Sequence, residues 1–241
     1  MSAQRLVLEG SIQADGGAKG ESSNGGGAGG GIWLNVGELV GEGSISANGG
    51  NNLITNSCVG CSFCAGGGGR IAVYYGDMSG FTGRMEARGG IGMYNDQTNA
   101  IASGGAGTVY LKMSNETGGE LIVDNGGGRT APGSTPLLQA PLTNLLRLTV
   151  SGGATVSLGD SAQETNQPLR LHSVNVISNA NLHSAPMVAL AISCTNLTID
   201  SSSCLNASGQ GYPGGAVVGN RNGSGPCGGI CVHLYGDAGT A

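Results

Sequence analysis

A glycine-bounded string recurs along the first half of the chain and constrains the fold more than any other feature. Residues 10–17 read Gly-Ser-Ile-Gln-Ala-Asp-Gly-Gly, residues 43–50 read Gly-Ser-Ile-Ser-Ala-Asn-Gly-Gly, and residues 83–90 read Gly-Arg-Met-Glu-Ala-Arg-Gly-Gly. Each copy is followed by a variable polar stretch and then by a glycine run that leads into an apolar segment. Fixed strings separated by variable inserts are typical of stacked supersecondary units. We therefore expect each unit to form one layer of an array.

Shorter units follow in the second half of the chain. Residues 149–156, 175–182 and 198–205 align with one another, in steps of 26 residues from Val156 to Leu182 and 23 from Leu182 to Leu205. Steps of this length suit one turn of a repeat array. Apolar and polar residues alternate along 169–172 and 174–176, which is the period of a strand. No stretch of useful length has the 3.6-residue period of a helix, so we expect negligible helix.

The glycine content can be read in two ways. The chain has 49 glycines in 241 residues, with 4% aromatic and 10% charged residues, a composition that often means a flexible linker. The apolar residues nevertheless arrive in short, regular strings, which favours order. Glycine runs such as residues 25–31 lack a Cβ and can pack against the same run one layer away. We expect the following apolar residues to point inward and to stack in ladders: Ile12, Ile45, Ile71, Met85, Val109 and Leu111.

The expected fold is all-β, a right-handed parallel β-helix or β-solenoid with glycine-rich repeats and negligible helix, because parallel crossovers are almost always right-handed. Residues 1–130 hold the glycine-rich repeats, and residues 131–241 hold shorter coils that return to the glycine-rich pattern at their end. We expect one continuous solenoid. No polar capping element is visible at either end, so we expect a fragment of a longer chain. Ends that stack on neighbouring copies to form a filament are the alternative.

Three strings carry a resemblance to a known class of protein. Residues 43–50, 66–75 and 104–112 resemble the glycine-rich, adhesin-like β-helical repeats of very large secreted or cell-surface proteins. The resemblance covers residues 6–128, while residues 142–241 resemble a generic right-handed parallel β-helix. It implies a fold and an extracellular or cell-surface location. It brings no catalytic motif.

The chain has seven cysteines, and disulfides are their expected role: Cys58, Cys61, Cys64, Cys194, Cys204, Cys227 and Cys231. The first three have C-x₂-C spacing, which can hold a metal or an iron–sulfur cluster. A fourth ligand at a suitable spacing is missing, and the sister repeats have no cysteine there. In a secreted protein the cysteines would form disulfides, with Cys194–Cys204 and Cys227–Cys231 as candidate pairs. The odd total leaves one thiol free or paired elsewhere.

Two further sets of residues are candidates for carbohydrate. Four sequons would permit N-glycosylation in a eukaryotic secretory pathway, although chance explains about this number: Asn115, Asn196, Asn206 and Asn222. Four aromatic residues are candidate contacts for a bound sugar: Trp33, Tyr74, Tyr75 and Tyr110. Trp33 can point outward while its neighbours Ile32 and Leu34 point inward. The alternative is an aromatic ladder that only braces the layers.

Catalytic, metal and nucleic-acid functions find little support. The 15 carboxylates form no recurring pair, and the three histidines lie in ordinary strand contexts. Matches to G-x-G-x-x-G follow from glycine abundance alone. Asp15, Asn48, Asp124 and Asn125 precede or adjoin glycines, where they favour turns but could also bind calcium. We therefore expect no catalytic residue, no cofactor and no metal site.

The partners and location follow from charge and hydropathy. The net charge is −5 and the basic residues are scattered singly, so we expect no nucleic-acid partner. No segment approaches the roughly 20 apolar residues of a membrane span, and the N-terminus lacks the layout of a signal peptide, so a secreted form would be a mature piece or a fragment. The expected function is a non-enzymatic extracellular structural or adhesive segment. Its expected partners are further repeats of its parent chain, neighbouring copies or surface carbohydrate. A carbohydrate-binding or polysaccharide-processing β-helix protein is the alternative.

Overall fold

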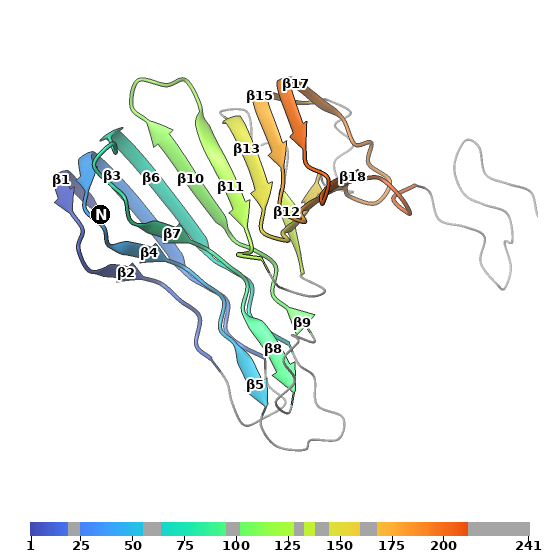
Figure 1. Cartoon of the computed structure of the whole chain (residues 1–241), viewed down its shortest axis with the longest axis horizontal. Coiled ribbons are helices and arrows are strands. Elements are labelled where there is room, and N and C mark those ends of the chain that lie inside the picture. The colour runs from blue at the N-terminus through green and yellow to red at the C-terminus, as the bar shows by residue number, and fades with distance from the viewer. Residues whose placement is uncertain are drawn as a thin grey trace, which may run out of the picture.

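The largest element of the fold is an eight-stranded sheet, which we call the spine sheet (Figure 1). The computed structural model describes residues 1–18, 25–54, 64–94, 102–127, 133–137, 145–159 and 168–211, and these form strands and no helix. The spine strands, in spatial order, are β1 (Ser2–Val7), β3 (Gly31–Val40), β6 (Arg70–Asp77), β10 (Thr108–Met113), β11 (Gly119–Asp124), β13 (Leu145–Ser151), β15 (Leu169–Val176) and β17 (Ile192–Ile199). The described chain is therefore all-β, as predicted. It contains no helix that could cross a bilayer.

Three smaller sheets accompany the spine sheet. The first wall consists of β2 (Ser11–Gln13), β4 (Ser44–Ser46) and β7 (Arg84–Glu86). The second wall consists of β12 (Ser134–Leu137), β14 (Thr155–Leu158), β16 (Asn181–Ser184) and β18 (Cys204–Asn206). A third small sheet holds β5 (Asn52–Ile54), β8 (Ile91–Tyr94) and β9 (Ala102–Ser103). All strand pairs are parallel except β10–β11 and β8–β9.

The strand register follows the repeats that the sequence predicts. Equivalent residues of successive units are direct partners along each ladder. The ladders are Ile12–Ile45–Met85 in the first wall, Ile32–Ile71–Val109 in the first half of the spine, Val150–Val176–Ile199 in its second half, and Val156–Leu182–Leu205 in the second wall. The predicted alignments of both halves are confirmed.

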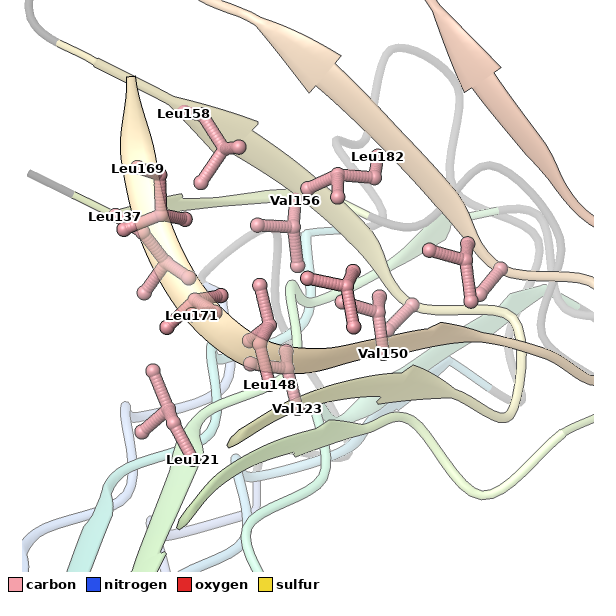
Figure 2. Packing of buried hydrophobic residues seen from close by; sticks show 14 of the residues in the cluster. Leu121, Val123, Leu137, Leu148, Val150, Val156, Leu158, Leu169, Leu171 and Leu182 are labelled. Carbon is pink, nitrogen blue, oxygen red and sulfur yellow. The ribbon is translucent and has the colours of Figure 1, made fainter. Parts of the chain in front are cut away.

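Two hydrophobic cores lie between the spine sheet and its walls. The first core joins spine residues such as Leu34 and Ile71 to Ile45 of the first wall, and all three are almost fully buried. The second core joins spine residues such as Leu148 to Leu182 of the second wall, and Figure 2 shows its side chains between the two layers. The six apolar residues predicted to point inward all belong to the first core or pack against it. Burial of apolar surface, at about 25 cal/mol per Å², is the main stabilising contribution.

The chain reverses its direction halfway along the spine sheet. Residues 114–118 form a turn that joins β10 to β11 in an antiparallel pair, in which Tyr110 lies opposite Leu121. Leu121 and Tyr110 pack in the second core, whereas Val109 and Ile122 pack in the first. Because successive side chains of a strand point to opposite faces, the two cores lie on opposite faces of the spine sheet. The repeats alone did not predict this reversal, which lies upstream of residue 130.

The glycine runs of the first half pack backbone against backbone. The N–H of Gly50 donates to the carbonyl of Gly27 (2.8 Å), that of Gly66 to Gly50 (3.0 Å), and that of Gly90 to Gly66 (2.8 Å). Gly50 and Gly90 belong to segments that leave the first wall, whereas Gly27 and Gly66 belong to glycine runs that return to the spine. Each hydrogen bond therefore joins a segment of one kind to a segment of the other. A Cβ at Gly66 would overlap the carbonyl oxygen of Gly27. Glycine is therefore required where the two segments meet.

Candidate functional site

Three of the four candidate aromatic residues lie together on the outer face of β3, β6 and β10. We call Trp33, Tyr74 and Tyr110 the aromatic strip. The ring centroids of Trp33 and Tyr74 are 5.8 Å apart, and those of Tyr74 and Tyr110 are 5.9 Å apart, in a T-shaped arrangement. Ala72 is the direct partner of both Trp33 and Tyr110. Its small side chain leaves room for Tyr74 to reach both rings diagonally.

Strand alternation decides which aromatic residues join the strip. Trp33 is 50% exposed while Leu34 beside it is buried in the first core, as predicted. Tyr75 points the other way from Tyr74 and packs against the first core. Tyr110 packs against the second core, because that core lies on the same face as the strip. The strip thus begins at an exposed indole and ends at the edge of a buried core.

The strip combines flat rings with hydrogen-bonding groups. Asn35 and Lys112 are the direct partners of Tyr74 on its two sides. Burial is the main cause that raises the pKa of Tyr110 above its usual value, and electrostatic interactions with Tyr74 and Glu116 raise it further. The phenol of Tyr110 is therefore protonated at neutral pH. A neutral phenol both donates and accepts hydrogen bonds. An exposed indole and two half-buried phenol rings beside such groups can hold the apolar face and the hydroxyls of a sugar.

A second group of polar side chains surrounds Arg147 on the opposite face of the spine sheet. Its guanidinium lies 3.3 Å from the carboxylate of Glu116 and 3.6 Å from that of Glu120. Glu120 also accepts a hydrogen bond from Thr149 (3.4 Å). The hydrogen bond and charge of Glu116 raise the pKa of Arg147. The guanidinium of Arg147 therefore forms ion pairs with both carboxylates. These contacts connect the β10–β11 turn to β13.

Tyr75 lies close to this group and is a poor candidate for a general base. Burial raises the pKa of its phenol, and the negative charge of Glu116 raises it further, while Arg147 opposes the shift. A phenol with a raised pKa is protonated at neutral pH and cannot accept a proton from a sugar. Sequence reasoning missed this group because Glu116 and Arg147 are 31 positions apart. Only the β11–β13 register brings them together.

The described cysteines are free thiols. Cys64 and Cys204 are exposed and Cys194 is half-buried, and the structure does not join Cys194 to Cys204. The Sγ of Cys204 lies 3.4 Å from the Oδ1 of Asn181. Four of the seven candidates fall outside the described residues: Cys58, Cys61, Cys227 and Cys231.

The sequons differ in accessibility. Asn115 is exposed in the β10–β11 turn, and Asn196 is exposed on β17, the last of the described spine strands. Asn206 is half-buried, and its Oδ1 accepts the N–H of Ser208 at 2.8 Å. Asn222 falls outside the described residues. The first two positions present their side-chain amides to solvent.

The Asx residues of the glycine-rich strings link one unit to the next. The Oδ1 of Asp15 accepts the N–H of Asn48 (2.6 Å), and the Oδ1 of Asn48 accepts the N–H of Arg88 (2.8 Å). Asn125 supplies the next link, because its Oδ1 accepts the N–H of Gly89 at 2.8 Å. Asp124 instead accepts the N–H of Gly126 within its own turn (2.7 Å). Within the described ranges, no group of three or more acidic, histidine or cysteine side chains could hold a metal ion.

No family model, curated protein or solved structure matches this chain. The function is therefore inferred from the residues and their geometry.

Proposed function

We propose that this chain is a segment of an extracellular, right-handed β-solenoid whose function is structural and adhesive and not catalytic. The observation that carries the proposal is the stacking of equivalent residues, unit upon unit, in both the spine and the walls. Such stacking creates extended, regular faces from small units, which is how repeat proteins form scaffolds and binding surfaces. Right-handed crossovers are the strongly preferred way to connect parallel strands in this manner.

The two edges of the spine sheet support association with further units. Among the described strands, β1 and β17 form these edges, and each carries exposed apolar side chains, among them Val7 (54% exposed) and Leu197 (47%). Leu197 is the direct partner of the buried Val174 and is the next residue of the same ladder. Unpaired strand edges with apolar side chains readily accept another strand. We infer that these edges contact further repeats of the parent chain or a neighbouring copy.

Sedimentation velocity over a concentration series tests the association. We expect the average mass to rise with concentration, and Leu197→Glu to reduce the rise because a carboxylate replaces an apolar contact at the edge. Met187→Glu is the matched control, because Met187 is similarly exposed (51%) but lies outside the edge strand. A mass that stays constant at every concentration, or equal effects of the two variants, would contradict association through β17.

Carbohydrate binding at the aromatic strip is the second candidate function, favoured by the grouping of Trp33, Tyr74 and Tyr110. Trp33 is the single tryptophan of the chain, so its fluorescence reports on the strip alone. We expect a saturable change in this fluorescence with one class of oligosaccharide in a panel. Tyr74→Ala removes the central ring and should weaken binding by about 0.5 to 1.5 kcal/mol. Tyr75→Phe, on the opposite face, should leave the affinity unchanged.

The location and the absence of catalysis have separate tests. An intact mass of naturally sourced protein, before and after reduction and alkylation, should reveal paired cysteines and added hexose if the chain is extracellular. Seven free thiols without glycan would contradict that location. Release of reducing ends from any polysaccharide that binds the strip would instead favour a polysaccharide-processing enzyme.

A further inference from the structure

A groove of about 440 Å³ opens beside β7, where the first wall ends. Its floor is apolar and consists of Val109, Leu111 and Ile122 of the spine sheet. The spine strands β1, β3 and β6 are each followed by a wall strand, but β10 is followed by the turn to β11. The floor therefore extends one unit further than the wall that should cover it. The groove occupies the place of a fourth wall strand.

The groove exposes a strand edge as well as an apolar floor. Among the described strands, β7 pairs with β4 alone. The N–H of Arg84 donates to Gly43 (3.1 Å), and the carbonyl of Glu86 accepts from Ala47 (2.8 Å), both on the β4 side. Because such bonds alternate along a parallel ladder, the N–H and C=O of Met85 point into the groove. An added strand can therefore form main-chain hydrogen bonds with β7.

The groove has a defined length and an exposed arginine at its rim. The groove ends beyond Arg88, because the side chain of Asn125 accepts the N–H of Gly89 at 2.8 Å. Asn125 therefore lies where an added strand would otherwise continue. Glu86 is shared between the guanidinium groups of Arg84 (3.5 Å) and Arg88 (3.0 Å). Two guanidinium groups and two carboxylates, those of Glu86 and Asp124, therefore line the groove, and the Arg84 side chain at its rim is 76% exposed. An acidic residue opposite Arg84 would complement this charge.

The same geometry excludes a second complete copy of the chain. A whole unit stacked on β7 would bring its own spine strand to the position that β10 already occupies. Only a single extended segment fits between β7 and the floor. We propose that the groove binds a peptide segment of a partner protein, added in parallel to β7, with one aliphatic side chain between two small polar or acidic residues. The wall strands Ser11–Gln13 and Ser44–Ser46 already have this polar–aliphatic–polar pattern.

Synthetic peptides with the sequence of residues 42–47 (Glu-Gly-Ser-Ile-Ser-Ala) provide the probe. Binding of a fluorescent peptide is measured by anisotropy against the full chain. We expect the peptide with Ser44→Asp to bind about two- to tenfold more tightly than the peptide with Ser44→Lys, because the changed residue lies opposite Arg84. The protein variant Arg84→Glu should reverse this order. Arg5→Glu, at an exposed arginine of β1, is the matched control and should leave the order unchanged.

Backbone-modified peptides test the strand geometry in the unaltered protein. In the proposed register the N–H at Ser46 donates to Met85, whereas the N–H at Ile45 points away from β7. N-methylation at Ser46 should therefore abolish binding, and N-methylation at Ile45 should leave it nearly unchanged. The variant Ile122→Lys places a charge in the floor and should weaken binding at least tenfold. Ile199→Lys, at an exposed isoleucine outside the groove, should not weaken it.

Three outcomes would overturn the proposal. The first is no saturable binding of any peptide up to about 1 mM. The second is equal binding of both N-methylated peptides, since this would exclude pairing with β7. The third is self-association that Arg84→Glu abolishes, which would assign the groove to another copy of the chain. These outcomes do not depend on association at β17 or on sugar binding at the aromatic strip.

Discussion

Two neighbouring glycines of one run, Gly67 and Gly69, should respond oppositely to alanine. A Cβ at Gly69 would overlap the carbonyl oxygen of Gly30, which belongs to a backbone segment that cannot move aside. A Cβ at Gly67 would meet a single atom, the carbonyl oxygen of Gly105 at 3.8 Å, in ordinary contact. Neither glycine has a positive φ in the left-handed region, so backbone conformation does not distinguish them.

The structure gives the expected size of the difference. Overpacking by one methyl group costs about 1 to 3 kcal/mol. Displacement of Gly69 also weakens two hydrogen bonds, from its N–H to Ala47 (2.6 Å) and from Thr108 to its carbonyl (3.0 Å), each worth about 1 kcal/mol. We therefore expect Gly69→Ala to lower the free energy of unfolding by about 3 to 5 kcal/mol. Gly67→Ala should raise it by about 0.4 to 1 kcal/mol, because alanine restricts the unfolded chain.

Urea unfolding at pH 7, followed by circular dichroism, measures both changes. Amide exchange at residue 69 and at Thr108 adds a local readout, because their N–H groups donate the two weakened hydrogen bonds and their protection should fall in Gly69→Ala alone. Equal stability of the two variants would refute the backbone-to-backbone contact at Gly69. A loss of stability in Gly67→Ala would refute the open space beside that residue.

Three further predictions concern single side chains. Hydrogen bonds from neighbouring backbone N–H and hydroxyl groups lower the pKa of Asp200 to about 2. The Asp200 carboxylate therefore stabilises the fold above the usual carboxyl pKa of about 3.9, and this stabilisation is lost as the pH falls toward 2. Urea midpoints should therefore separate wild type from Asp200→Asn at pH 7 and converge near pH 2. Leu148→Ala should cost about 2 to 5 kcal/mol because Leu148 is fully buried, whereas Leu197→Ala at the exposed edge should cost less than about 1 kcal/mol; equal midpoints would contradict the core. Asn125→Ala should cost about 1 to 3 kcal/mol and should speed amide exchange at Gly89, which loses its acceptor.

The ladders could be predicted because repeated strings determine register. Ile12, Ile45 and Met85 hold the same place in three copies of one string, and identical places in stacked units become partners. The alternation of strand residues also predicted that Trp33 would point outward. The same rule, applied to two adjacent tyrosines, would have separated Tyr74 from Tyr75. Strand alternation along residues 74 and 75 is therefore the sequence signal that separates the aromatic strip from Tyr75.

The reversal at residues 114–118 was harder to predict. Alternation shows that Leu121 and Ile122 face opposite ways, but it does not show which of them faces which core. That choice depends on the antiparallel pairing of β10 with β11, a tertiary contact. The two apolar strings at 108–113 and 119–124, separated by a short polar segment, were the available signal for a hairpin. The groove beside β7 was missed for the same reason, because it exists only where the hairpin replaces a wall strand.

The reversal also explains why the two cores lie on opposite faces. The spine strands stack in one direction from β1 to β17, while the chain runs one way in β1–β10 and the opposite way in β11–β17. Reversal of strand direction alone would change the hand of the spine-to-wall crossovers. Transfer of the core to the other face changes the hand again, so both halves keep one hand. Because one hand is strongly preferred for parallel crossovers, the hairpin and the change of face must occur together.

Both candidate binding surfaces follow from this coupled change. Where the core changes face, the first wall ends, and no described wall strand lies over the floor of the groove at Val109, Leu111 and Ile122. On the other face the second wall covers the spine only from the junction onward, so Tyr110 lies at the edge of the second core and Trp33 lies beyond it. A uniform array without the hairpin would cover the floor with a fourth wall strand. The junction is therefore where we expect this otherwise repetitive chain to bind its most specific partners.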